Sequence, residues 1–358
     1  MNKIRQYILK SKEICIGLED SKKTWKVCAR SGRTMVNETS MPAEYENLRN
    51  YLTNKFPSCK IRVMYEAGFR GFELHDKLVA DGYSCVVTPP HTVTQEKCNR
   101  QKNDRNDSRR LSRNLENQDY RSCYVPSRKV REDRQISRFQ AQLQRDITRA
   151  CNRIRRTIEF HGLEKHFADG KWTEYTYRAA EKLVATLNLN DSLRFVFTKM
   201  SEELRFLRAQ KATVVKRLRE LAKSAEYRTQ VELLSSAPGI GVLTAIRLAL
   251  EWGDVRRFGS KEKFASFTGL IPRDYSSGEE IHKGHITKQG SRAVRAWLIE
   301  SAWHAIRHDP ILLEKYQAVV SRCGSAKKAI VAVAHKLAIR LRALLISGQP
   351  YQIGLESN

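Results

Sequence analysis

The chain reads KIRVMYEAGFRGFELHDKLVADGYSCVVT from Lys60 to Thr88, and this stretch decides the fold of its first third. The run from Lys60 to Tyr65 predicts a strand that ends at Glu66, and residues 72–80 have the apolar spacing of a helix. Residues 83–88 form a second β-rich run that is closed by two prolines. A strand, a helix and a strand in this order predict an α/β domain whose sheet is partly parallel.

The residues before this stretch extend the same domain. The apolar run 13–18 and the β-rich run 24–29 predict a hairpin whose first strand ends at Glu19, and residues 42–56 predict a helix. Functional sites in such sheets gather at the carboxyl ends of the strands. Glu19 and Glu66 both stand where a strand ends, so we expect them at a site.

A third group of acids follows the last strand. Residues 102–108 read KNDRNDS, which places Asp104 and Asp107 three positions apart beside Lys102 and Arg105. In a helix both carboxylates lie on one face, and carboxylates close to nucleic acid need a hard cation such as Mg²⁺ between them and the phosphates. The alternative is a solvated helix start, with Asp104 as N-cap and Asp107 in the first turn.

Composition points to a polyanionic partner. The 358 residues carry 65 Lys and Arg against 39 Asp and Glu, a formal net charge of +26, and 41% of them are hydrophobic, enough for folded cores. Nucleic acid is the leading partner for such a charge. The eight cysteines include no CxxC pair, which argues against a zinc site or a disulfide framework. We expect a cytoplasmic, nucleoid-associated prokaryotic protein without a membrane segment.

Two long helices are predicted in the middle of the chain. Apolar residues recur every three or four positions between 128 and 160 and again between 193 and 221. We expect a basic helical arm, coiled-coil in type, that pairs within the chain or joins two or four copies of it. The expected buried positions are Ile136, Phe139, Leu143, Ile147, Ala150, Ile154 and Ile158, then Val196, Met200, Leu204, Leu207, Val214, Leu218 and Leu221.

Residues 230–346 predict a third, mainly helical region. The Pro-Gly-Ile-Gly turn at 238–241 between two helical runs has the pattern of a helix-hairpin-helix, in which Gly239 and Gly241 would let backbone amides reach a phosphate. The alternative is an ordinary tight turn between helices. A Ser-Ser-Gly loop follows at 276–278, and a cationic loop runs from Lys283 to Arg292. Surface serines in turns are common, so the loop alone assigns no chemistry.

The ordered set of these motifs resembles the DEDD transposases. The motifs are an acidic strand end before Ser-Lys-Lys-Thr, a strand ending in Glu, and Lys-x-Asp-x-x-Asp, followed by Pro-Gly-Ile-Gly, Gly-Leu-x-Pro-x-x-x-x-Ser-Gly and Lys-x-Gly-x-x-x-x-Arg. The family comprises insertion-sequence recombinases, with Piv-type DNA invertases and bridge-RNA-guided elements as relatives. The resemblance covers nearly the whole chain.

The resemblance implies a domain layout and a composite site. A RuvC-like (RNase H-like) domain would span 1–125, a coiled-coil arm 126–228, and a C-terminal transposase domain 229–358. The implied site combines Mg²⁺ held by Glu19, Glu66, Asp104 and Asp107 with Ser277 as nucleophile, the two parts coming from different protomers of an oligomer. The implied partners are DNA and a structured guide RNA. The candidate nucleic-acid contacts are Lys102, Arg105, Gly239, Gly241, Lys283, Lys288, Arg292 and Arg295.

One position departs from the family, which usually has Asp where this chain has Glu19. The extra methylene moves the carboxylate by about a bond length, and Mg²⁺ demands tight octahedral geometry. Asp20 could replace it only if the strand ends or bulges there. Two other functions stay open: a metal-dependent nuclease of the junction-resolvase kind, which needs the acids but not Ser277, and a nucleic-acid-binding protein without catalysis.

Overall fold

A computed structural model describes residues 13–90, 104–164, 189–274 and 283–355. The chain forms two compact units, Met1–Pro126 and Ser127–Asn358.

The first unit is built on a five-stranded mixed sheet. The strands are β1 (Glu13–Glu19), β2 (Thr24–Ser31), β3 (Thr34–Pro42), β4 (Lys60–Glu66) and β5 (Ser84–Thr88), in the spatial order β3-β2-β1-β4-β5. β1, β4 and β5 run parallel, and β2 and β3 are antiparallel to their neighbours. The predicted hairpin and the predicted parallel part of the sheet are therefore confirmed, and this architecture fits the expected RuvC-like domain.

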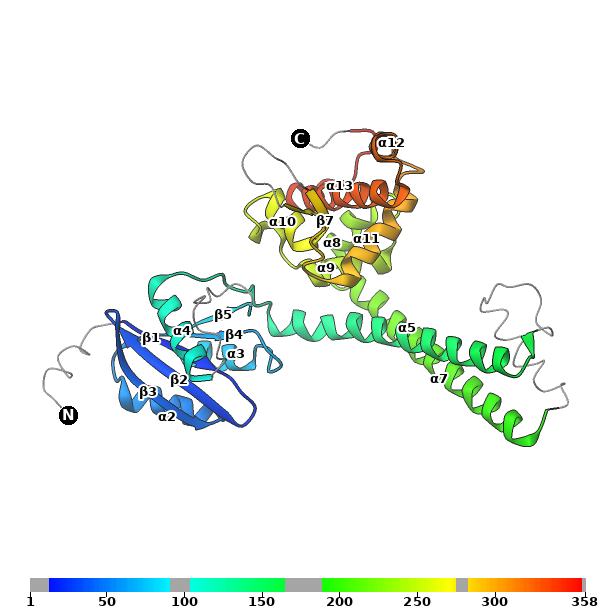
Figure 1. Cartoon of the computed structure of the whole chain (residues 1–358). Coiled ribbons are helices and arrows are strands. Elements are labelled where there is room, and N and C mark those ends of the chain that lie inside the picture. Colours follow the sequence, from blue (N-terminus) through cyan, green and yellow to red (C-terminus); the bar gives the residue numbers. More distant parts are fainter. Residues whose placement is uncertain (1–12, 91–103, 165–188, 275–282, 356–358) are drawn as a thin grey trace, which may run out of the picture. The chain divides into compact units, whose positions relative to one another are not determined.

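Helices cover both faces of this sheet (Figure 1). α2 (Tyr45–Lys55) and α3 (Glu73–Ala80) pack Leu48, Leu52, Leu74 and Leu78 against one face. α4 (Asp104–Asn117) packs Leu111 and Leu115 against the other, next to Cys15 and Met64. Successive strand residues point to opposite faces, so odd-numbered residues of β1 and even-numbered residues of β4 face α4.

Strand β3 was not predicted from the sequence. Its residues, TMVNETSMP, are mostly polar, and nearly all of them are partly or fully exposed because β3 lies at the edge of the sheet. An edge strand of this kind lacks the apolar alternation that identifies a strand. The helix predicted for 42–56 accordingly begins later, at Tyr45.

Gly17 sets the distance between β1 and α4. A Cβ atom built on Gly17 would lie 2.1 Å from the Ser108 carbonyl oxygen and 2.3 Å from the Ser112 backbone nitrogen. Both serines are fully buried, and their small side chains let the helix backbone lie directly on the strand. The contact fixes the start of α4, with its two aspartates, near the carboxyl end of β1.

We expect the substitution Gly17→Ala to destabilise the protein by about 3 kcal/mol or more, because the methyl group meets backbone atoms that cannot turn aside. Gly68→Ala is the matched control in the same unit, since its Cβ would lie no closer than 3.8 Å to any atom. Its effect should stay within about 1 kcal/mol. Urea unfolding of the two variants checks this, and equal stabilities would contradict the account.

The second unit begins with two long helices that pack antiparallel. α5 (Arg128–Phe160) and α7 (Asp191–Ala222) are joined by Arg153–Glu203 and by a hydrogen bond from Lys211 Nζ to Gln144 Oε1 of 2.6 Å. The predicted positions Leu143, Ile147, Ala150, Ile154, Ile158, Leu204, Leu218 and Leu221 are buried as expected. Two residues of the prediction are wrong, and the coiled-coil geometry itself remains a prediction.

Phe139 and Val196 were expected to be buried, but they are 45% and 40% exposed. Gln140 and Phe197, their neighbours in sequence, take the inward positions. One residue turns a helix by about 100°, so a shift of one position moves a side chain off the contact face. The buried glutamine could not be found from apolar spacing, because a polar residue occupies a core position.

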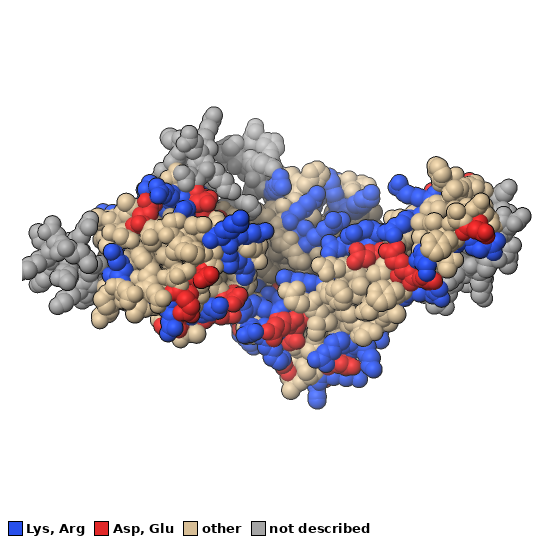
Figure 2. Space-filling model, turned by 90° about the horizontal axis from the view of Figure 1, so that it is seen from below, with Lys and Arg blue, Asp and Glu red and all other residues tan. Residues whose placement is uncertain are grey.

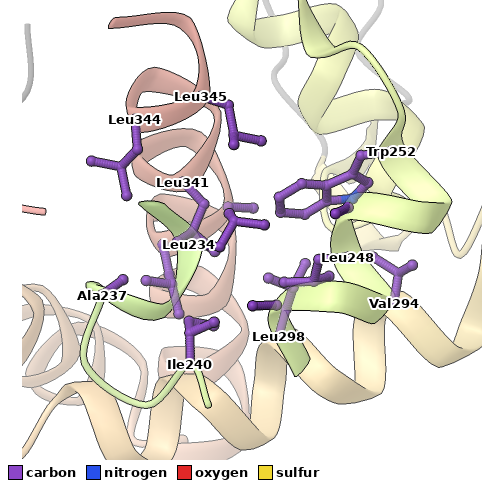
Figure 3. Close-up of a cluster of buried hydrophobic side chains, with 14 of the residues drawn as sticks. Leu234, Ala237, Ile240, Leu248, Trp252, Val294, Leu298, Leu341, Leu344 and Leu345 are labelled. Atoms are coloured by element: carbon purple, nitrogen blue, oxygen red, sulfur yellow. The ribbon is translucent and has the colours of Figure 1, made fainter. Parts of the chain in front are cut away.

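The rest of the second unit is a helical domain around one core. Its helices are α8 (Arg228–Ser235), α9 (Val242–Trp252), η2 (Val255–Arg257), α10 (Lys261–Thr268), α11 (Arg292–Ala305), α12 (Pro310–Cys323) and α13 (Ala326–Ser347). Figure 3 shows Leu341, Leu344 and Leu345 of α13 beside Leu234 of α8 and Trp252 of α9. A mixed α/β first unit and a helical C-terminal region thus agree with the fold class predicted from the sequence.

Candidate functional site

Glu19 and Glu66 lie side by side at one edge of the sheet. β1 and β4 are parallel neighbours in which Leu18 pairs with Tyr65, so the next residues, Glu19 and Glu66, end the two strands together. Both face the side of the sheet that α4 covers. The edge predicted to carry the site therefore brings its first two acids into one place.

α4 brings the aspartates to the same edge. Asp104 is its first residue and is exposed, and Asp107 lies half-buried one turn later. Arg110, one further turn along, joins this helix to β4: its Nη2 lies 3.0 Å from Asp107 Oδ1 and 2.9 Å from Glu66 Oε1. Sequence reasoning missed Arg110, although its spacing of three residues from Asp107 is that of a helical ion pair.

The cluster carries more negative charge than its surroundings offset. Burial, and after it the carboxylates of Asp107, Glu66, Asp20 and Asp104 in that order, together raise the pKa of Glu19 to about 7. Asp107, Glu66 and Asp104 therefore all act electrostatically on Glu19. Clustered carboxylate oxygens are the donors that a hard divalent cation prefers, so the residue types fit such an ion.

The acids are not arranged as a finished metal site. In the described parts of the chain, no three acidic, histidine or cysteine side chains converge closely enough to hold an ion. The backbone thus brings the four expected ligands to one edge of the sheet, but their side-chain oxygens do not converge on a common point. Arg110 stands between two of these acids, which accounts for part of the difference.

Asp20 has a different environment from Glu19. It follows the last residue of β1, is 8% exposed, and its Oδ2 has no hydrogen-bond partner among the described residues. Burial raises its pKa to about 6, and Arg70 acts in the opposite direction. The Arg70 guanidinium lies 5.6 Å from the Trp25 ring centroid, and Trp25 belongs to the core under α2 and α3. Asp20 therefore borders the other face of the sheet.

Several predicted residues of the second region lie at the edge of what is described. β6 (Pro272–Asp274) and β7 (Lys283–Ile286) form a short antiparallel pair in which Asp274 pairs with Lys283. Ser277 stands in the sequence between them and lies outside the described residues, as do Lys102 and the Lys283 side chain. Sequence analysis expected only loops here, because strands this short carry no periodic pattern.

The predicted cationic loop is held against the end of α10. Gly269 has a φ of +67°, and a Cβ added there would lie 1.9 Å from the Gln289 carbonyl oxygen. Arg295 Nη1 donates to the carbonyls of Gln289 and Gly290 at 3.0 and 3.1 Å. Arg295 thus holds the loop by hydrogen bonds to its backbone carbonyls, whereas the Lys288 and Arg292 side chains are exposed.

The Pro-Gly-Ile-Gly turn joins α8 to α9. Gly239 has a φ of +82°, and an added Cβ would lie 2.4 Å from the Ser301 carbonyl oxygen of α11, so packing alone requires glycine there. A Cβ on Gly241 would meet no atom within 4 Å, and the turn borders an open hollow with His304 and His308. Both glycines are exposed and line this hollow, and the helix-hairpin-helix assignment remains a prediction.

Positive charge is dispersed over the face of the molecule that Figure 2 shows. Figure 2 shows Lys and Arg side chains, Asp and Glu among them, over the face in view. Arg105, beside the acid cluster, is one of the exposed cations. Among the described residues on this face, the distribution marks no single patch.

Two family models match this chain. Residues 16–161 match a DEDD model of the IS110 kind, described as "Transposase", and residues 231–317 match the model described as "Transposase IS116/IS110/IS902 family". The chain belongs to the DEDD-type insertion-sequence transposases. As a member of this family it is a transposase, an enzyme that acts on DNA, and the DEDD domain points to the use of a divalent metal.

Relatives with this name match over most of the chain. The transposase for insertion sequence element IS1111A of Coxiella burnetii is 26% identical over 75% of this chain and 73% of its own length. The putative transposase y4rJ of Sinorhizobium fredii is 29% identical over 78% and 75%. The transposase for IS1533 of Leptospira borgpetersenii is 21% identical over 95% and 97%. Within the described residues, none of the helices combines the length and apolar character needed to cross a membrane.

The pKa of Glu19 predicts a pH dependence of stability. The ordinary value is 4.5 and the folded value about 7, so between them the folded protein binds the extra proton. The free energy of unfolding then gains a contribution that is complete below the ordinary value and is lost as the pH rises through the folded one.

We expect metal-free Glu19→Gln to lose less stability than the unaltered protein between about pH 5 and about pH 8, because glutamine does not titrate. Glu44→Gln, at an exposed position, should keep the original pH dependence. Urea unfolding at both pH values measures this. A fall in Glu19→Gln as large as that in the unaltered protein would contradict the assigned environment of Glu19.

Proposed function

We propose that this transposase cuts and rejoins DNA during transposition of an insertion element, with a divalent cation, Mg²⁺, at the acid cluster and Ser277 as nucleophile. The metal-binding part of this proposal is supported by one observation. Glu19, Glu66 and Asp107 lie together at one edge of the sheet, with Asp104 close enough to act on Glu19. The serine rests on its place in the family motif.

Glu19, Glu66, Asp104 and Asp107 would hold the ion. When bound, it would polarise a phosphate and offset charge on the attacking and leaving oxygens. Glu19 must lose its proton to serve as a ligand, and its raised pKa of about 7 makes that loss harder below neutral pH. The distance of the Asp104 and Asp107 carboxylates from the sheet edge depends on α4, which Gly17 lets lie close to β1.

Ser277 would attack a backbone phosphate through its hydroxyl oxygen. A bond forms between this oxygen and phosphorus, the bond from phosphorus to the departing DNA oxygen breaks, and the serine proton ends on the departing hydroxyl or in solvent. The phosphoserine linkage retains the energy of the broken bond, so a second attack rejoins the strand without ATP. A serine hydroxyl needs activation for this step because its free pKa is high.

The remaining partners follow from the same assignment. DNA phosphates or a structured guide RNA would be contacted by six positions. These are the exposed Arg105, Lys288 and Arg292, the open backbone at Gly241, and Lys102 and Lys283. The α5–α7 arm exposes Phe160 and Phe195 by 86% and 63%, which supports an oligomer, dimer or tetramer, formed through it. Such an oligomer would let the serine of one protomer serve the acids of another.

A metal-dependent nuclease is the second candidate, favoured by the acid cluster alone. It needs Glu66 and Asp107 but has no use for Ser277, and water would attack the phosphate instead. A nucleic-acid-binding protein without catalysis would tolerate the loss of every acid. Salt-dependent DNA binding is expected of all three and separates none of them.

We expect a covalent protein–DNA adduct when the full chain is incubated with Mg²⁺, element-end DNA and RNA transcribed from the element's flanks. Ser277→Ala should abolish the adduct, and Asp107→Asn should reduce it by a factor of about 10³ or more, since both act on the chemical step. Ser276→Ala, the neighbouring serine, is the matched control and should keep it. Denaturing gels with labelled DNA measure all four proteins.

Other outcomes separate the candidates. Free cleaved DNA that persists in Ser277→Ala would identify the nuclease. DNA binding with no cleavage in any protein, and no change on substitution of the acids, would identify the binding protein.

A further inference from the structure

Arg110 makes a bridge between two of the four acids. A single terminal nitrogen, Nη2, lies 2.9 Å from Glu66 Oε1 on β4 and 3.0 Å from Asp107 Oδ1 on its own helix. The side chain is only 21% exposed, and its Nε is buried without a hydrogen-bond partner among the described residues. The guanidinium thus pairs with the two carboxylates and is largely shielded from water.

The neighbouring arginine shows what an ordinary ion pair on this helix looks like. Arg109 donates from Nε and Nη2 to the two oxygens of Glu38 on β3, at 2.8 and 2.7 Å. That pair uses two nitrogens on one carboxylate, in the fork geometry that suits arginine best. Arg110 instead shares one nitrogen between two carboxylates from different elements. The positions of the two acids therefore determine its geometry, and it does not form the two-nitrogen fork.

A guanidinium in this position occupies oxygens that a metal ion would need. Glu66 Oε1 accepts a hydrogen bond from this nitrogen and Asp107 Oδ1 forms an ion pair with it, so the two oxygens converge on one point from different elements. A divalent cation binds carboxylate oxygens at about 2.0–2.6 Å. It cannot share these two oxygens with an arginine nitrogen already placed between them, and two cations so close would also repel each other.

We propose that Arg110 is the resident counter-cation of the acid cluster: it pairs with Glu66 and Asp107 while the cluster is metal-free and competes with the divalent cation for their oxygens. This inference rests on the proposed metal site. Arg110 acts as a positioning residue, holding two acids near each other before the metal arrives. Its release from the carboxylates is part of the free energy of metal binding.

The competing explanation is a stabilising ion pair at helical spacing with no bearing on the metal. Both explanations predict that loss of Arg110 weakens the metal-free fold. They differ in the affinity for the ion: competition predicts tighter binding after the loss, whereas a purely structural role predicts equal or weaker binding as the acids separate. The sign of the change in metal affinity therefore decides between them.

The experiment is a calorimetric titration of the full chain with Mn²⁺ and with Mg²⁺, in the absence of nucleic acid. Arg110→Gln should bind the ion about tenfold more tightly than the unaltered protein, a difference of about 1.4 kcal/mol. Arg109→Gln removes the same charge from the next position and should leave the affinity unchanged. Arg110→Lys keeps the charge but loses the planar guanidinium, so it should bind severalfold more tightly.

Each result has a separate meaning. Unchanged or weaker binding in Arg110→Gln, with normal binding in the unaltered protein, overturns the inference and leaves the proposed function standing. An equal gain in Arg109→Gln also overturns it, because the effect would then be one of net charge. Absence of binding in every protein contradicts the metal site itself. If Arg110→Gln does not fold, Arg110→Lys decides, and an affinity equal to that of the unaltered protein counts against the inference.

Discussion

The contact between Gly17 and the backbone of α4 is the constraint on which the acid cluster depends. Because β1 has no side chain at that point, the helix lies with the Ser108 carbonyl and the Ser112 amide directly on the strand. Asp107 then stands one residue before this contact, and Glu19 two residues after Gly17. A larger residue at position 17 would lift the helix, and with it the aspartates, away from the two strand-end glutamates. The sheet supplies one half of the cluster, and this close approach brings the other.

The close approach places like charges together, and neighbouring side chains offset this repulsion only in part. Four acids gather at one edge, and the pKa of Glu19 rises to about 7 through burial and the neighbouring charges. Arg110 offsets the charge of Glu66 and Asp107 but leaves Glu19 and Asp104 without a described ion-pair partner. A partly offset cluster is what a cation-binding site requires, since full neutralisation by the protein would remove the attraction for the ion. On the proposed assignment, the same residues would account for stability without metal and for affinity toward it.

Much of this could be predicted from the sequence, and the failures have physical causes. Apolar runs that end in acid located β1 and β4, and the spacing of Asp104 and Asp107 placed both on one helix face. Edge strand β3 was not predicted because its polar residues face solvent. Phe139 was predicted to be buried, but Gln140 occupies that core position instead. The role of Gly17 was invisible, because a close approach depends on the partner backbone. Arg110 was overlooked because a basic residue in a basic segment gives no sign of the acid on another strand. Ser277 rests on its motif alone.

The central claim is that the strand-end glutamates and the α4 aspartates form one metal centre. The most direct measurement is a crystal structure of the full chain grown with Mn²⁺, with the ion located by its anomalous scattering. The account predicts a peak at the sheet edge within bonding distance of Glu66 and Asp107 oxygens, with the Arg110 guanidinium withdrawn from the position it holds between them without metal. An ion bound elsewhere, or an intact Arg110 bridge in a crystal that holds Mn²⁺ at other sites, would contradict it.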